Sequence, residues 1–115
     1  MDDYKEKRKH PRYEVSWHVT VFTDQGAIEG ETINISIDGI SICCEEPLQL
    51  EKIFRITIAP QNHPILQIAG KVIWADLYGL DRKDTTIGMG ICFVEVSDED
   101  HRIIKELISS LSLQK

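Results

Sequence analysis

The sequence lacks several features that would assign it to other classes of protein. Its 115 residues hold only three cysteines, Cys43, Cys44 and Cys92, and no Cys-x-x-Cys pair. An odd number that includes an adjacent pair is not the pattern of a disulfide framework, so we expect free thiols and leave a redox role open. Apolar runs are short, whereas a membrane-spanning helix needs about 20 residues. With no apolar signal region at the charged N-terminus, we expect a cytoplasmic protein without membrane insertion.

Motifs of catalysis and metal binding are also missing. The four histidines are scattered, and no two of them have the spacing of a metal-binding His-Glu-x-x-His motif. The chain has no nucleophile elbow, no phosphate-binding Gly-Lys-Ser/Thr loop and no dinucleotide-binding glycine motif. We therefore expect a protein that is not an enzyme and that has no metal or cofactor.

Basic residues are scarce and unevenly distributed. The chain has 13 Lys and Arg against 19 Asp and Glu, a formal net charge of -6. Residues 1–12 hold five basic and three acidic residues, which leaves eight basic and 16 acidic residues for 13–115. An acidic body repels DNA and RNA, whereas a basic segment suits a small anionic ligand. A solvated charged tail explains the same pattern, so charge alone leaves both interpretations open.

What the sequence does contain is a succession of short strand patterns. Apolar and polar residues alternate with a period of two, which is typical of a strand with one buried face. The segments are residues 14–21, 28–37, 40–44, 54–58, 66–75 and 87–96. Turn signals such as Asp24-Gln25-Gly26 and Asp38-Gly39 separate them. This spacing predicts a mainly β domain, an antiparallel barrel or sandwich. Since side chains fill so small a barrel, a ligand has to bind its outer surface or rim.

The C-terminal segment has a helical period instead. One apolar stripe recurs at helical spacing, formed by Ile103, Ile104, Leu107, Ile108 and Leu111. Ser97 is placed as N-cap, and Asp100 is placed to reach back to it in a capping box. We predict a helix over about 98–112 that packs this stripe against the β-structure.

Two short motifs are candidates for ligand binding. Arg8-Lys9-His10-Pro11-Arg12 sets two arginines four residues apart, and Pro11 excludes a continuous helix. A guanidinium can bind phosphate bidentately, grip a guanine edge or stack on a base. In the second motif, 34–39, Asn34 and Ser36 share the polar face of a strand, while Gly39 lets the backbone turn and approach a ligand. Each motif alone is equally explained as a tail or a turn.

Together the two motifs resemble the PilZ domain family, which carries Arg-x-x-x-Arg at the domain start and [Asp/Asn]-x-Ser-x-x-Gly on a following strand. Both are complete here, and the segments 70–74 and 88–93 are also similar, so the resemblance spans nearly the whole chain. It implies a six-stranded antiparallel β-barrel with a C-terminal α-helix that binds the bacterial second messenger cyclic di-GMP. The ligand-binding residues that it implies are Arg8, Arg12, Asn34, Ser36 and Gly39.

Two further ligand candidates follow from that resemblance, and one residue departs from it. Lys7 precedes the arginine motif, and Trp74 offers a stacking surface for guanine, although a partly buried barrel tryptophan explains it as well. The family often has Asp at the position of Asn34. Asn keeps the acceptor oxygen and adds a donor, but it loses the charge.

The resulting hypothesis divides the chain into a flexible basic segment, residues 1–12, and a single barrel domain, residues 13–115. Cyclic di-GMP is expected to bridge the arginines to the barrel wall, order the segment and alter binding to an unidentified downstream effector protein. The alternative is a PilZ-like protein interaction module that does not bind nucleotide. The downstream process and the choice between a monomer and a weak homodimer stay open.

Overall fold

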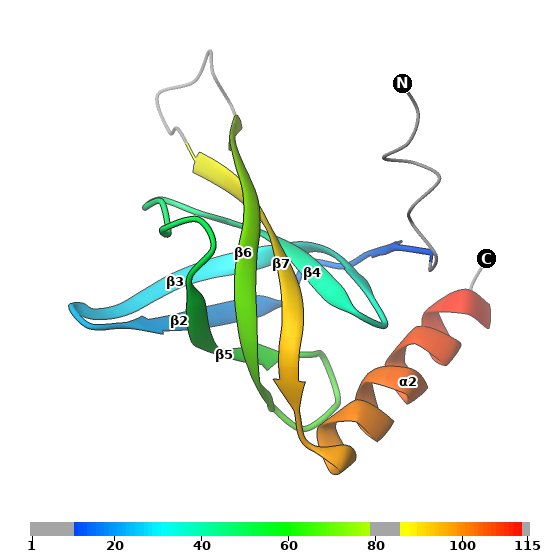
Figure 1. Ribbon diagram of the computed structural model, residues 1–115. Helices are drawn as coiled ribbons and strands as arrows, with labels where there is room; N and C mark the ends of the chain where they lie inside the picture. Colours follow the sequence, from blue (N-terminus) through cyan, green and yellow to red (C-terminus); the bar gives the residue numbers. More distant parts are fainter. Residues whose placement is uncertain (1–10, 79–85, 114–115) are drawn as a thin grey trace.

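The computed structural model describes residues 11–78 and 86–113. Within these ranges the chain forms a series of strands followed by one helix (Figure 1). The elements are β1 (Tyr13–Glu14), β2 (His18–Thr23), β3 (Gly26–Ser36), β4 (Gly39–Cys44), β5 (Ile53–Ala59), β6 (Leu66–Tyr78), β7 (Thr86–Val96) and α2 (Asp98–Leu113).

Six of these strands close into an antiparallel barrel. Neighbouring strands follow the order β1-β3-β2-β5-β6-β7-β4. An additional pairing of β3 with β4 closes the strands β2 to β7 into a ring. Every pairing is antiparallel, and β1 adds only a two-residue pairing beside β3. The predicted six-stranded antiparallel barrel with a C-terminal helix is therefore confirmed.

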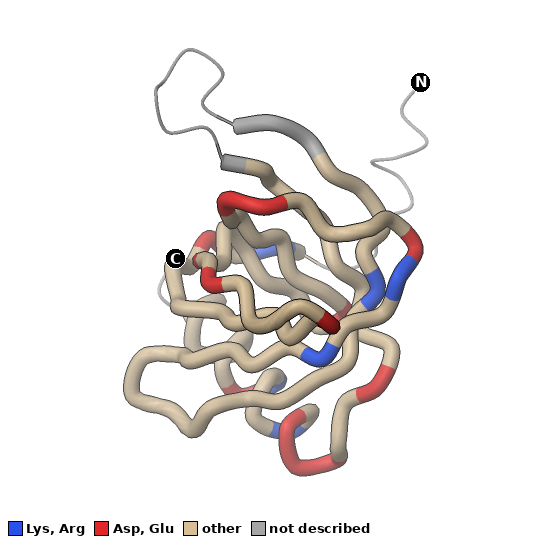
Figure 2. The backbone as a smooth tube through the Cα atoms, turned by 90° about the vertical axis from the view of Figure 1, so that its left-hand side faces the viewer, with Lys and Arg blue, Asp and Glu red and all other residues tan. Residues whose placement is uncertain are grey.

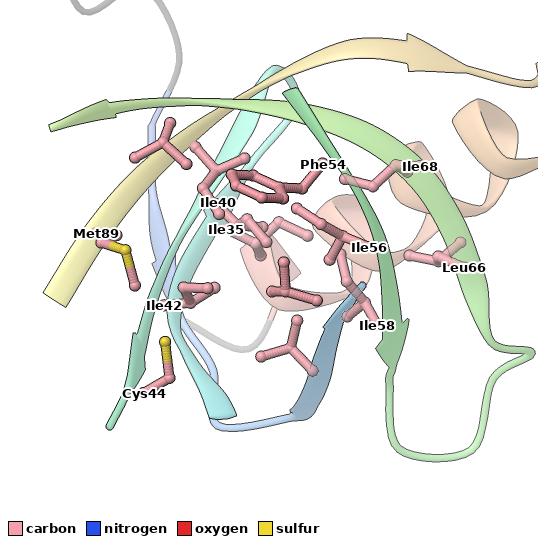
Figure 3. Packing of buried hydrophobic residues seen from close by; sticks show 14 of the residues in the cluster. Ile35, Ile40, Ile42, Cys44, Phe54, Ile56, Ile58, Leu66, Ile68 and Met89 are labelled. Atoms are coloured by element: carbon pink, nitrogen blue, oxygen red, sulfur yellow. The ribbon is translucent and has the colours of Figure 1, made fainter. Parts of the chain in front are cut away.

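Side chains that alternate along the strands fill the barrel. Figure 3 shows them pointing into the interior from several strands, with labels on Ile35, Ile40, Ile42, Cys44, Phe54, Ile56, Ile58, Leu66, Ile68 and Met89. Burial of each large aliphatic side chain contributes roughly 1.5–3 kcal/mol. Since apolar side chains occupy the interior, the outer surface and the rims are left for binding.

The helix α2 covers part of this core with its apolar stripe. Ile103, Ile104 and Leu107 are buried in the same cluster as the barrel residues. The Asp100 N–H donates to Ser97 Oγ at 3.1 Å, which confirms Ser97 as the N-cap. The Asp100 carboxylate accepts from the Gln67 N–H of β6 at 3.2 Å, so it ties the helix to the barrel. Over the described residues, no helix has the length and apolarity needed to span a membrane.

The first predicted strand, 14–21, is interrupted. β1 ends at Glu14, which pairs with Asn34, and β2 begins at His18, which pairs with Glu31. The segment between Glu14 and His18 is one residue longer than the facing segment between Glu31 and Asn34. The cause is Thr32, whose hydroxyl accepts from the Trp17 N–H and donates to the Val15 carbonyl, both at 2.9 Å. The Thr32 side chain therefore bridges the extra residue of a local bulge, beside backbone bonds from the Val15 N–H to the Ile33 carbonyl and from the Thr32 N–H to the Trp17 carbonyl.

The last hairpin is longer than predicted. β6 continues to Tyr78 and β7 begins at Thr86, whereas the sequence pattern ended these strands at Ala75 and Ile87. The central part of the predicted loop, 79–85, lies outside the described residues. Gly70 lies at a register shift between β6 and β7.

Candidate ligand-binding surface

Arg12 of the arginine motif lies beside the 34–39 motif on the outer face of the barrel. β1 pairs with β3 so that Glu14 lies opposite Asn34 and Tyr13 opposite Ile35. Arg12 directly precedes β1, so it lies beside the end of β3 that carries Asn34 and Ser36. The fold thus brings together residues that are more than 20 positions apart in the sequence.

Arg12 is held by a residue that belongs to neither sequence motif. Its Nη1 donates to Ser41 Oγ at 3.3 Å. Ser41 is buried, and it lies directly opposite Asn34 in the pairing of β3 with β4. A signal for this contact exists in the sequence, because a two-residue turn at Ile37–Asp38 sets Ser41 opposite Asn34.

Two buried polar atoms on this surface have no hydrogen-bond partner in the part of the chain that the structure describes. They are Nε of Arg12, a donor, and Oδ1 of Asn34, an acceptor. Leaving such a group unsatisfied costs about 1–3 kcal/mol, so an orphaned pair calls for an explanation. A ligand that displaces the groups covering these atoms and presents both an acceptor and a donor, such as a phosphate linked to a nucleobase, would satisfy both of them.

Ser36 has a structural role in the turn between β3 and β4. Its hydroxyl donates to Asp38 Oδ1 at 2.7 Å, and the same Ser36 Oγ accepts from the Asp38 N–H at 3.4 Å. The Asp38 carbonyl in turn accepts from the Phe93 N–H of β7 at 3.0 Å. Ser36 therefore fixes the turn that supports the candidate surface.

The reason for Gly39 differs from the prediction. Of the described glycines only Gly26 has a positive φ, so Gly39 is not needed for the backbone of the turn. A Cβ at position 39 would instead stand 2.5 Å from the Ile91 carbonyl oxygen of β7. Close packing of β4 against β7 is what requires glycine here.

Trp74 belongs to the same row of outward-facing residues. Trp74 pairs with Gly90, Gly90 with Ser41, and Ser41 with Asn34, across four neighbouring strands. Directly paired residues point to the same face of a sheet. The Trp74 indole lies over Gly90, in the space that a Cβ there would need. Of the other candidates, Lys7 and Arg8 lie outside the described residues.

Comparisons with known proteins agree with this fold and these motifs. The PilZ domain family matches residues 6–110. The chain belongs to the PilZ domain family. Its predicted resemblance to that family is thus confirmed, as is the expectation that it is not an enzyme, because PilZ domains are non-catalytic receptors. No curated protein matched the sequence.

Solved structures show the same fold at low sequence identity. The PilZ domain of YcgR from Escherichia coli, solved with c-di-GMP, has a TM-score of 0.80 and 17% identity, covering 94% of this chain and 93% of that one. The MrkH–c-di-GMP complex from K. pneumonia has a TM-score of 0.82 and 16% identity over 93% of this chain. MotI/DgrA, a Bacillus subtilis inhibitor of motility, has a TM-score of 0.75 and 18% identity over 95% of this chain. The chain spans 53% of MrkH and 52% of MotI.

Proposed function

We propose that this chain binds cyclic di-GMP on the surface formed by the arginine motif and the β3–β4 hairpin. The residues assigned to the ligand are Arg8, Arg12, Asn34, Ser36 and Gly39, with Lys7 and Trp74 as further candidates. In this proposal the arginines engage phosphate and guanine, while Asn34 meets a base edge. Ser36 acts through the turn that it fixes, and Gly39 acts through the close approach of β4 to β7.

The observation that carries the proposal is the orphaned pair, Arg12 Nε and Asn34 Oδ1. One belongs to each family motif, and Ser41 lies beside both of them. A buried donor or acceptor without a partner lowers the stability of the free protein. A ligand that bonds to both atoms removes this penalty in the complex. The YcgR and MrkH structures solved with c-di-GMP share the fold, which supports the choice of ligand.

The proposal is tested by isothermal calorimetry with cyclic di-GMP. We expect wild-type binding that weakens about 10- to 100-fold in Arg12→Ala, since a hydrogen bond to a charged group contributes roughly 1.5–3 kcal/mol. Arg12→Lys is expected to recover little of this loss, because lysine keeps the charge without the bidentate fork. Ser36→Ala should weaken binding by relaxing the turn.

Two controls distinguish this site from others. Arg55→Ala changes an exposed arginine of β5, outside the candidate surface, and should leave the affinity within about twofold of wild type. Undetectable wild-type binding would favour the alternative, a PilZ interaction module that does not bind nucleotide. Wild-type affinity retained in Arg12→Ala and Ser36→Ala would place the ligand elsewhere on the protein.

The receptor proposed here transmits its signal in the cytoplasm through a partner protein. Ligand binding orders the N-terminal segment against the barrel, and the ordered segment presents a new surface to a downstream effector. Residues 1–10 lie outside the described residues, so this step rests on the position of Arg12, where the segment joins the barrel.

A further inference from the structure

The open edge of β3 lies far from the motif surface, at the other end of the same strand. Figure 1 shows the β2–β3 hairpin projecting beyond the barrel, and residues 46–49 of the connection from β4 to β5 line one hollow together with this hairpin. β4 ends at Cys44, which pairs with Gly30. The preceding part of β3, residues 26–29, pairs only with β2 among the described strands. One side of this stretch is therefore open.

The backbone on the open side carries unpaired hydrogen-bonding groups. The Thr32 N–H donates to the Trp17 carbonyl at 2.8 Å. Backbone groups alternate between the two sides of an antiparallel strand, so the even positions back to Gly26 face β2. The backbone N–H and C=O groups of Ala27 point away from β2, and no described strand pairs with them on that side; those of Glu29 lie next to Gly30 and Cys44, the last pair of β3 with β4. Such an edge is a template for an added strand.

A groove with an acidic and an apolar part runs beside this edge. Two hollows of about 440 and 410 Å³ share Ala27, Ile28 and Glu46. The acidic residues that line the first hollow are Glu29, Glu31, Glu45 and Glu46, and the Glu29 carboxylate also bonds to His18 and Thr20 of β2. The apolar side chains of the second include Ile28, Leu48 and Phe54. No described residue that lines either hollow is basic. The nearby Lys52 lies 5.6 Å from the Phe54 ring centroid and 3.9 Å from Asp24.

We propose that this groove binds an extended basic segment of a partner protein, added as a strand along Ala27 and Glu29. Side chains of a strand alternate between two faces. Lysine or arginine on one face would meet the glutamates, and apolar residues on the other would meet Ile28 and Leu48. The same carboxylates repel a polyanion. This contact needs no nucleotide, so it is independent of the function proposed above.

The test is an NMR titration of the ¹⁵N-labelled protein with two synthetic peptides. One peptide has eight residues with alternating lysine and valine, and the other replaces each lysine by glutamate. Only the lysine peptide is expected to shift the amide signals of Ala27 and Glu29 and to slow their hydrogen exchange at least tenfold at saturation. Equal binding of both peptides, or of neither, overturns the proposal.

Two double variants locate the contact. Glu45→Lys/Glu46→Lys reverses exposed charges in the groove and should lower the affinity for the lysine peptide at least tenfold. Glu95→Lys/Glu106→Lys reverses two exposed charges elsewhere, and its affinity for the lysine peptide should stay within twofold of wild type. An equal loss in both variants would mean attraction to the acidic body as a whole, and would overturn the groove as the site. The Glu45→Lys/Glu46→Lys variant is also titrated with cyclic di-GMP, and its affinity is expected to equal that of wild type. A loss of peptide binding is then distinguished from a loss of the proposed function.

Discussion

Gly39 lies where β4 runs closest to β7. A methyl group at this position would meet the Ile91 carbonyl oxygen at 2.5 Å, and backbone cannot move aside as a flexible side chain can. We predict that Gly39→Ala lowers the free energy of unfolding by about 1–3 kcal/mol, the usual range for overpacking. Urea denaturation measures this loss, with exposed Gln67→Ala of β6 as a control within about 0.5 kcal/mol of wild type. A wild-type midpoint in Gly39→Ala would contradict the packing explanation.

The thiols of Cys43 and Cys44 offer a second prediction at single residues. Burial raises the pKa of both thiols, and the charge of Glu31 adds to this effect at Cys43. A raised pKa lowers the thiolate fraction at neutral pH, and only the thiolate reacts. We expect slower alkylation by iodoacetamide at pH 7.5 in the folded protein than in urea, with the difference narrowing as pH rises past 9. Mass spectrometry of peptides measures both rates, and rapid labelling of the folded protein would reopen a redox role.

The candidate site was predictable in part from residue identities. Arg12, Asn34 and Ser36 follow from their motifs, and the structure places them on one surface. Ser41 did not follow from a motif, because its importance comes from the pairing with Asn34 across the hairpin. The position of Gly39 was predicted, but its physical reason was not, since the approach of β7 depends on a strand some 50 residues further along the chain.

At the scale of elements, α2 shows how much one helix contributes to the barrel. Ile104 is fully buried in the barrel core, whereas Leu113 near the end of the same helix is 85% exposed. We predict that Ile104→Ala costs about 2–5 kcal/mol of stability, through lost transfer free energy and the cavity that remains. Leu113→Ala removes a similar volume from an exposed position and should change stability by less than about 0.5 kcal/mol. Chemical denaturation compares the two, and equal effects would mean that α2 does not pack as described.

Strand and helix periods predicted most elements because each element has one buried face. The alternation of Val15, Trp17 and Val19 gave no sign of the break between β1 and β2. That break is made by the Thr32 hydroxyl from the neighbouring strand, which bonds to the backbone at Val15 and Trp17. Contacts between strands of this kind leave no mark in the pattern of a single strand.

At the scale of the whole molecule, charge separates the barrel from its N-terminal segment. The described residues, 11–78 and 86–113, include 14 acidic and six basic residues, and Figure 2 shows the acidic positions in red, scattered along the tube. An acidic body repels an anionic ligand except where arginines gather. The arginine motif therefore has to supply most of the attraction, and the barrel has to supply the shape and the hydrogen-bonding partners.

The same division of roles predicts where hydrogen exchange changes on ligand binding. If cyclic di-GMP bridges the arginine motif to the β3–β4 hairpin, amides of residues 5–12 should exchange more slowly at saturation, because the bound segment gains lasting contacts. Exchange of amides in the core strand β5 should slow only as far as ligand binding stabilises the whole fold against unfolding. This stabilisation is about 2.7 kcal/mol at a ligand concentration 100 times the Kd. Exchange measured by mass spectrometry on wild type and Arg12→Ala gives the comparison. Unchanged exchange at residues 5–12 in the saturated wild type would rule out ordering of the segment while leaving binding itself intact.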